Sequence, residues 1–84
     1  MTLTKARKSR ATEIDILVSK NLKAKRRELG ISWQALSKLI GSSAEQIQKY
    51  EKGTNRISSG KLFAFAQCLK VPIDYFFEQN NKTR

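Results

Sequence analysis

The chain has 84 residues, with 17 Lys or Arg against 7 Asp or Glu, and its formal net charge is +10. This length holds one small domain at most, because short chains bury a smaller share of their surface than long ones. The sequence contains no His and a single Cys, which excludes a His-dependent catalytic centre, a Cys/His zinc site and an intrachain disulfide, so we expect no metal and no cofactor.

The charge predicts a polyanionic partner, either nucleic acid or an anionic membrane surface. No apolar run approaches the roughly 20 residues that a membrane span needs. The single Cys68 lies in an apolar run, as is typical of a protein of the reducing cytoplasm.

Both ends of the chain are polar. Residues 1–12 carry four basic side chains and no acidic one, and we expect a flexible basic arm there, or alternatively an inert solvated tail. Residues 79–84 are predicted to fray. The folded domain is therefore predicted to span residues 13–78.

Apolar residues recur at helical spacing from Ile14 to Leu29 and predict a first helix, which Gly30 ends. Ser32 is a suitable cap for a second helix, which ends at Gly41 after about two turns.

Ser43 and Gln46 have the spacing of a capping box, which predicts a third helix from Ala44 to about Lys52. Its only large apolar residues are Ile47 and Tyr50, so most of its circumference is polar.

Ser58 or Ser59 caps a predicted fourth helix with a clear apolar stripe. Pro72 breaks the chain and suits the first turn of a fifth, short helix. We see no alternation typical of strands and predict an all-α fold of five short helices.

The second and third helices have the features of a helix-turn-helix, with Gly41 in the turn and the small Ser37 where the helices cross. The apolar residues that would lock the crossing angle are Leu36, Ile40, Ile47 and Tyr50. The outer face of the third helix would then be free to meet base edges.

Over residues 16–77 the sequence resembles the Cro/repressor-type helix-turn-helix proteins of the XRE family. The segments that carry the resemblance are Asn21–Arg26, Leu29–Ser32, Ile47–Gly53 and Leu69–Phe77, and Gln48–Arg56 is similar to one bacterial branch in particular. The resemblance implies a five-helix repressor-like domain that binds double-stranded DNA. It further implies a transcriptional regulator that occupies an operator in the bacterial cytoplasm, at the nucleoid.

The resemblance places the base-reading positions on Ala44, Glu45, Gln48 and Lys49. Lys49 is long enough to reach guanine, Gln48 can pair with adenine, and Glu45 can accept from cytosine. Glu45 has an alternative role, because a carboxylate in the first turn stabilises a helix.

Phosphate contacts are expected at helix N-termini and in polar or basic loops. The candidates are Trp33, Gln34, Ser43, Lys52, Thr54, Asn55 and Arg56. The family usually has Gln at the position of Trp33, and the indole N–H can donate to a phosphate or the ring can fold back into the core.

Related proteins pair an Arg of the first helix with a Glu at the end of the third helix, which reads the bases and is called the recognition helix. The resemblance therefore implies that Arg26 and Glu51 form a structural ion pair inside the fold.

Five of the seven aromatic residues lie within residues 63–77. They either all fill the core or leave an outward apolar patch. We expect a homodimer contact through Phe63, Tyr75 and Phe76, which would place two recognition helices about 34 Å apart.

Two other functions are compatible with parts of the sequence. One is a protein-interaction module, such as an antitoxin-type partner with secondary DNA binding. The other is a basic peptide on anionic membranes, which would leave the turn pattern of residues 32–52 unexplained. An enzyme is not expected, because no nucleophile–base pair is visible, and neither is a small-molecule ligand.

Overall fold

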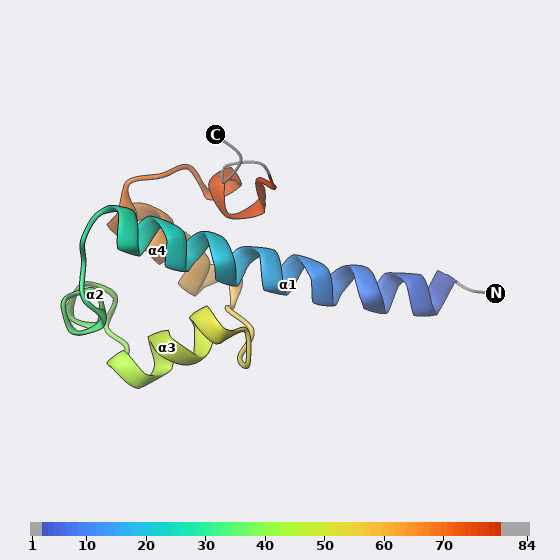
Figure 1. Ribbon diagram of the computed structural model, residues 1–84, viewed down its shortest axis with the longest axis horizontal. Helices are drawn as coiled ribbons and strands as arrows, with labels where there is room; N and C mark the ends of the chain where they lie inside the picture. Colours follow the sequence, from blue (N-terminus) through green and yellow to red (C-terminus); the bar gives the residue numbers. More distant parts are fainter. Residues whose placement is uncertain (1–2, 80–84) are drawn as a thin grey trace.

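The computed structural model describes the backbone of residues 3–79 and the side chains of residues 13–79. This part of the chain is entirely helical and contains no strand, as the sequence predicted (Figure 1). Its elements are α1 (Leu3–Glu28), α2 (Trp33–Ile40), α3 (Ala44–Lys52), α4 (Ser59–Leu69) and the 3-10 helix η1 (Ile73–Phe77).

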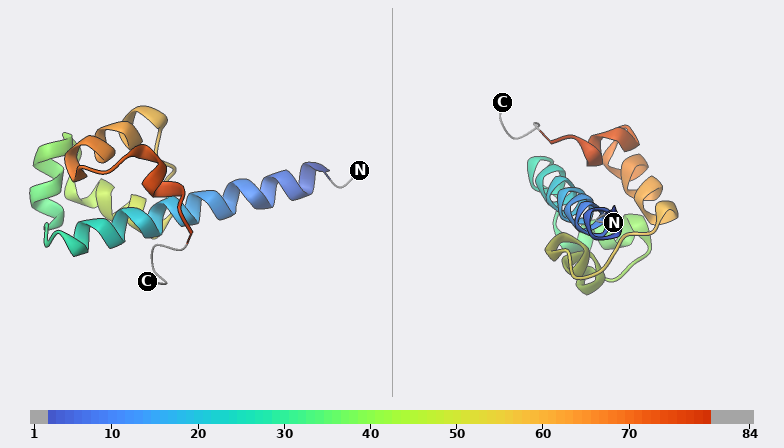
Figure 2. Two further views of the ribbon diagram at one scale, coloured as in Figure 1. Left: turned by 90° about the horizontal axis from the view of Figure 1, so that it is seen from above. Right: turned by 90° about the vertical axis from the view of Figure 1, so that its right-hand side faces the viewer.

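Helix α1 is longer than predicted. It begins at Leu3, so the segment expected to be a flexible arm, residues 1–12, is helical from Leu3 onward. No Gly or Pro interrupts this segment, and its Ala, Lys and Arg residues have high helix propensity. The N-terminal part of α1 extends beyond the other helices (Figures 1 and 2). The predicted frayed tail, residues 79–84, lies outside the described residues from residue 80 on.

Three serines begin the three later α-helices. The side-chain oxygens of Ser32, Ser43 and Ser58 each accept a hydrogen bond from the backbone N–H three residues further on, at 3.0, 3.0 and 3.1 Å. Each bond satisfies one of the N–H groups that a helix start leaves without an intrahelical partner. The cap of α4 is thus Ser58 and not its neighbour.

Glycines end α2 and α3. Gly41 has φ 78° and Gly53 has φ 81°, both in the left-handed region that residues with a Cβ rarely adopt. The turn between α2 and α3 is sharp because Gly41 reverses the chain and Ser43 starts the next helix at once.

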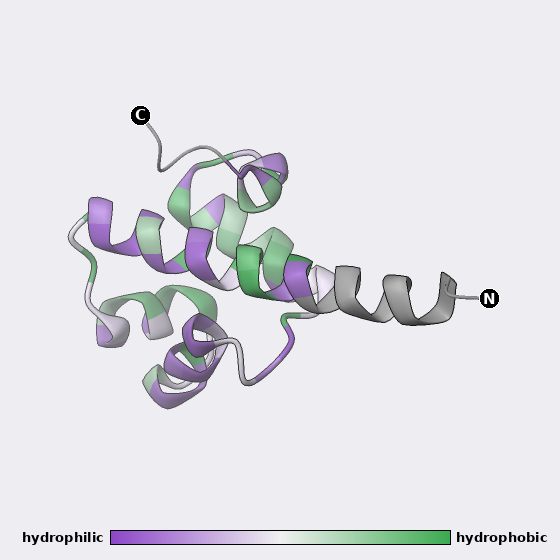
Figure 3. Cartoon of the chain, turned by 45° about the vertical axis from the view of Figure 1, so that its right-hand side comes forward, coloured by the Kyte–Doolittle hydropathy of each residue, from purple (hydrophilic) through white to green (hydrophobic). Residues whose placement is uncertain are grey.

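The core lies where α1 crosses the other elements, and Figure 3 shows apolar residues concentrated where α1 meets α4. Tyr50 and Phe65 meet edge to face, with ring centroids 5.9 Å apart. The buried apolar side chains are Val18, Leu22, Leu36, Ile47, Tyr50, Leu62, Phe65, Ala66, Leu69 and Phe76. Every described element therefore contributes to one core.

The last predicted helix is a five-residue 3-10 helix, so the count of five α-helices is not confirmed. Pro72 precedes it and makes no side-chain cap, and so short a segment favours the tighter 3-10 form. The buried Asn21 of α1 holds it in place. Its Nδ2 donates to the carbonyls of Tyr75, Phe76 and Glu78 at 3.2, 2.8 and 2.9 Å.

Candidate nucleic-acid interface

The second and third helices form a helix-turn-helix whose inner faces are locked together. Leu36 of α2 and Ile47 of α3 are completely buried, Tyr50 is nearly so, and Ile40 is half-buried. These four side chains are the ones that the sequence singled out as the lock. They fix the back of α3 against α1 and α2.

The four predicted base-reading residues share the opposite face of α3. Glu45 and Lys49 are exposed, while Ala44 and Gln48 are half-buried. The other three follow Ala44 by one, four and five residues. This spacing places all four on one side of a helix, away from Ile47. Helix α3 itself lies at the edge of the fold (Figure 1), and much of it is hydrophilic (Figure 3). Its outer face is thus open to a partner.

The candidates for phosphate contact lie around the ends of α2 and α3. Gln34, Lys52 and Asn55 have exposed side chains. The hydroxyl of Thr54 donates to the carbonyl of Lys49 at 3.1 Å.

Arg56 extends from the loop after α3 towards α1. Its Nε donates to Asp15 Oδ2 at 2.9 Å, and both side chains are accessible to solvent. Sequence reasoning missed Asp15, which precedes its partner by 41 residues.

Trp33 lies in the first turn of α2 and is half-buried. Its Nε1 donates to Glu51 Oε1 at 3.1 Å, and the Arg26 guanidinium lies 4.9 Å from the centre of its ring. The sequence left two alternatives for Trp33, a phosphate contact or a ring folded back into the core. The geometry corresponds to a side chain folded back onto the protein.

Arg26 and Glu51 face each other between α1 and α3. Arg26 Nε lies 2.6 Å from Glu51 Oε2 and Nη2 lies 3.1 Å from Oε1, while Nη1 donates to the carbonyl of Ile31 at 2.9 Å. The side chains are 11% and 3% exposed, so the pair is nearly dry. The structure thus contains the ion pair that the family resemblance implied.

The predicted outward patch needs a correction at Phe76. This residue is completely buried in the core, so its assignment to an outward dimer contact is wrong. A 3-10 helix turns by about 120° per residue, so neighbouring side chains point in different directions. The exposed aromatic residue of η1 is its neighbour Phe77, which sequence reasoning did not select.

The other two patch residues differ in exposure. Phe63 is 54% exposed in the second turn of α4. Tyr75 is half-buried and packs edge to face against Phe76, and Lys25 Nζ lies 5.1 Å from its ring centre. Phe77 lines a small cavity together with Ser59 and Leu62 of α4. Leu62 directly precedes Phe63 in the sequence.

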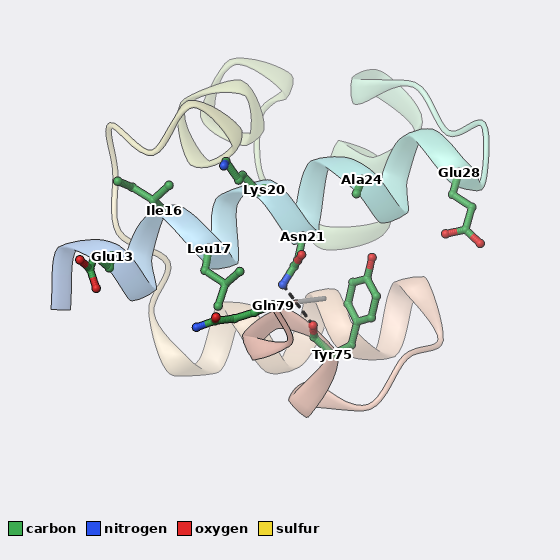
Figure 4. Close-up of a pocket in the computed structure, with 9 residues that line it drawn as sticks. All are labelled: Glu13, Ile16, Leu17, Lys20, Asn21, Ala24, Glu28, Tyr75 and Gln79. Carbon is green, nitrogen blue, oxygen red and sulfur yellow. Dashed lines mark hydrogen bonds between the residues drawn. The ribbon is translucent and has the colours of Figure 1, made fainter. Parts of the chain in front are cut away.

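A cleft of about 380 Å³ lies between α1 and η1 (Figure 4). Its lining includes Lys20, Asn21, Ala24 and Tyr75. The view along α1 shows η1 and α3 on different sides of that helix (Figure 2). The cleft is therefore separate from the outer face of α3.

Two further features bear on possible partners. No helix within residues 3–79 combines the length and the apolar character needed to cross a membrane. Among the described side chains, no three Asp, Glu, Cys or His groups are placed to share a metal ion.

Several known proteins are similar to this chain in sequence or in fold. The family model described as "Helix-turn-helix" matches residues 22–76. An uncharacterized HTH-type transcriptional regulator of Sinorhizobium medicae is 42% identical over 71 residues, covering 84% of this chain and 51% of that protein. The chain thus spans about half the length of the curated relatives it matches.

Two solved structures have similar folds. A crystal structure of the P22 c2 repressor in complex with a synthetic operator has a TM-score of 0.67 and 26% identity, covering 73% of this chain and 92% of that one. CoII HppE in complex with substrate has a TM-score of 0.71 but 20% identity, covering 80% of this chain and 38% of that one, and shares the fold alone. The chain belongs to the helix-turn-helix family, of the Cro/repressor type that its sequence resembles.

Proposed function

We propose that this member of the helix-turn-helix family is a transcriptional regulator that binds double-stranded DNA sequence-specifically and acts by occupying an operator. The observation that carries the proposal is the outer face of α3, where Glu45 and Lys49 are exposed while the opposite face is locked into the core. The similarity to a repressor bound to a synthetic operator supports it.

In this proposal α3 enters the major groove, whose width admits an α-helix. Lys49 donates to guanine O6 or N7, Gln48 pairs with adenine, Glu45 accepts from a cytosine amino group, and Ala44 touches a thymine methyl. The mechanism is occupancy and requires neither catalysis nor a cofactor.

Phosphate contacts hold α3 in register on the duplex. We assign them to the exposed Gln34, Lys52 and Asn55, to Ser43 at the start of α3, and to Thr54 and Arg56 after its end. Each phosphate that a Lys or Arg side chain neutralises adds about −0.9 to the slope of the logarithm of the binding constant against the logarithm of salt concentration, so about six such contacts over a dimer give a slope near −5.

The proposed active form is a homodimer with Phe63 and Phe77 in the contact, because both are exposed near the start of α4. Tyr75 is half-buried and contributes at most its edge. A twofold pair places two α3 helices one DNA turn, about 34 Å, apart.

The test is selection of bound duplexes from a random pool by the full chain. The proposal predicts an enriched inverted repeat with half-sites about one turn apart. A pool that shows no enriched sequence after repeated selection contradicts sequence-specific binding. An enriched single half-site contradicts the homodimer only.

A further inference from the structure

Trp33 joins the two helices of the helix-turn-helix at the ends that lie far from their shared turn. It is the first residue of α2, and its partner Glu51 is the second-to-last residue of α3. The hydrogen bond from Nε1 to Oε1 measures 3.1 Å. The chain itself fixes one end of the pair of helices at Gly41, and this bond fixes the other.

The Glu51 carboxylate accepts three charge-assisted hydrogen bonds, two from Arg26 and one from Trp33. Its side chain is only 3% exposed, so each bond is made in a poorly hydrated site where electrostatic interactions are strong. The Trp33 ring lies over the Arg26 guanidinium at 4.9 Å and covers the pair on the side of α2.

An indole has a single polar hydrogen and no acceptor. In Trp33 that hydrogen is already bonded to a buried carboxylate. If Trp33 donated this hydrogen to a phosphate, Glu51 would lose one of its three donors. Water scarcely reaches the Glu51 carboxylate and could not replace that donor, so the exchange would cost free energy.

We propose that Trp33 is a positioning residue for base recognition and not a phosphate contact. It sets the angle of α3 against α2 through Glu51, and thereby the placement of Gln48 and Lys49 on the bases. Recognition needs such side chains held within about 0.5 Å of their working geometry, so a small rotation of α3 weakens base contacts before phosphate contacts. The inference rests on the DNA-binding function proposed above.

The test compares a selected duplex with a scrambled one, using the full chain and Trp33→Phe. Phe keeps a ring over Arg26 but has no donor for Glu51. The proposal predicts that the variant binds the selected duplex about tenfold more weakly, as expected for one impaired base contact, with unchanged affinity for the scrambled duplex. Gln34→Ala, the adjacent exposed position in the same turn, is the matched control and weakens both duplexes alike.

Equal weakening of both duplexes by Trp33→Phe, or no change in either, overturns the proposal. If the wild-type chain does not distinguish the duplexes at all, the DNA-reading function fails and the next measurement still tests the contact itself.

Trp33 is the only Trp of the chain, so a ¹⁵N NMR spectrum of the unmodified protein contains one indole N–H signal. The proposal predicts that this hydrogen exchanges slowly with water in the free protein and stays equally protected on DNA. Rapid exchange in the free protein, with protection only on DNA, overturns it. This measurement needs no variant, so it tests the Trp33–Glu51 contact even if Trp33→Phe does not fold.

Discussion

Arg26 of α1 and Glu51 of α3 form a two-point ion pair, with Nε 2.6 Å from Oε2 and Nη2 3.1 Å from Oε1. The pair connects the long first helix to the last turn of the proposed recognition helix. The neighbouring Arg27 and Lys52 are exposed, so one of these three basic residues is a structural cation and two are accessible to a partner.

Arg26→Ala is expected to destabilise the domain by about 3–5 kcal/mol, because it leaves the Glu51 carboxylate buried without its cation. In a domain of this size such a loss brings the protein close to unfolding. Urea unfolding followed by circular dichroism measures it. The control is Arg27→Ala, an exposed position expected to change stability by less than about 0.5 kcal/mol. An unchanged urea midpoint for Arg26→Ala would refute the structural role.

Gly53→Ala and Gly60→Ala are expected to have opposite effects. Gly53 has φ 81°, so a Cβ there strains the backbone by about 1–2 kcal/mol, although its nearest neighbour, the Ser19 hydroxyl, is at an ordinary 3.5 Å. Gly60 is in α4 with no atom within 4 Å of an added Cβ, and Ala stabilises it by up to about 1 kcal/mol. Thermal unfolding of the two variants measures both effects. Equal shifts in melting temperature would contradict the conformations assigned to the two glycines.

The caps and stops of the middle helices were predictable because their signals are local. A Ser that bonds three residues ahead and a Gly with positive φ act within one turn of chain, and α2 and α3 have the predicted bounds. The buried face of α3 followed from the spacing of Ile47 and Tyr50. Both features depend little on the rest of the fold.

Other features depend on contacts across the fold. The charge of residues 1–12 suggested an arm, whereas the backbone continues α1 through most of them. The choice between Phe76 and Phe77 depends on the twist of η1 and on the three hydrogen bonds from Asn21, more than 50 residues earlier. The partner of Trp33 lies 18 residues away in the next helix, beyond any local pattern.

Asp15→Asn is expected to increase affinity for DNA of any sequence by about fivefold, since it removes a negative charge beside Arg56 and weakens the hydrogen bond that holds its Nε. Stability should change by less than about 1 kcal/mol, because the Arg56 side chain is 76% exposed. Titration of a scrambled duplex measures the effect. Asp74→Asn removes an equal charge on η1 and is the control. An equal gain in both variants would show that only net charge matters.

Phe63→Ser is expected to shift the chain from dimer to monomer, because it replaces an exposed ring of the proposed contact with a small polar group. Sedimentation equilibrium over a range of concentrations measures the change. Ile16→Ser alters another exposed apolar residue, which lines the cleft beside η1, and it should leave the dimer intact. A wild-type chain that sediments as a monomer, both free and on DNA, contradicts the dimer.

The base preferences of variants on the outer face of α3 test the central claim most directly. Binding to a panel of duplexes that each carry one substitution in the selected site should show that Gln48→Ala and Lys49→Ala each lose about 1–3 kcal/mol of discrimination at a particular base pair. Arg56→Ala should weaken every duplex alike and reduce the salt slope by about 0.9 for each bound protomer, which is about 1.8 for the proposed homodimer. Unaltered preferences in the Gln48 and Lys49 variants would contradict the assignment of α3 as the reading helix.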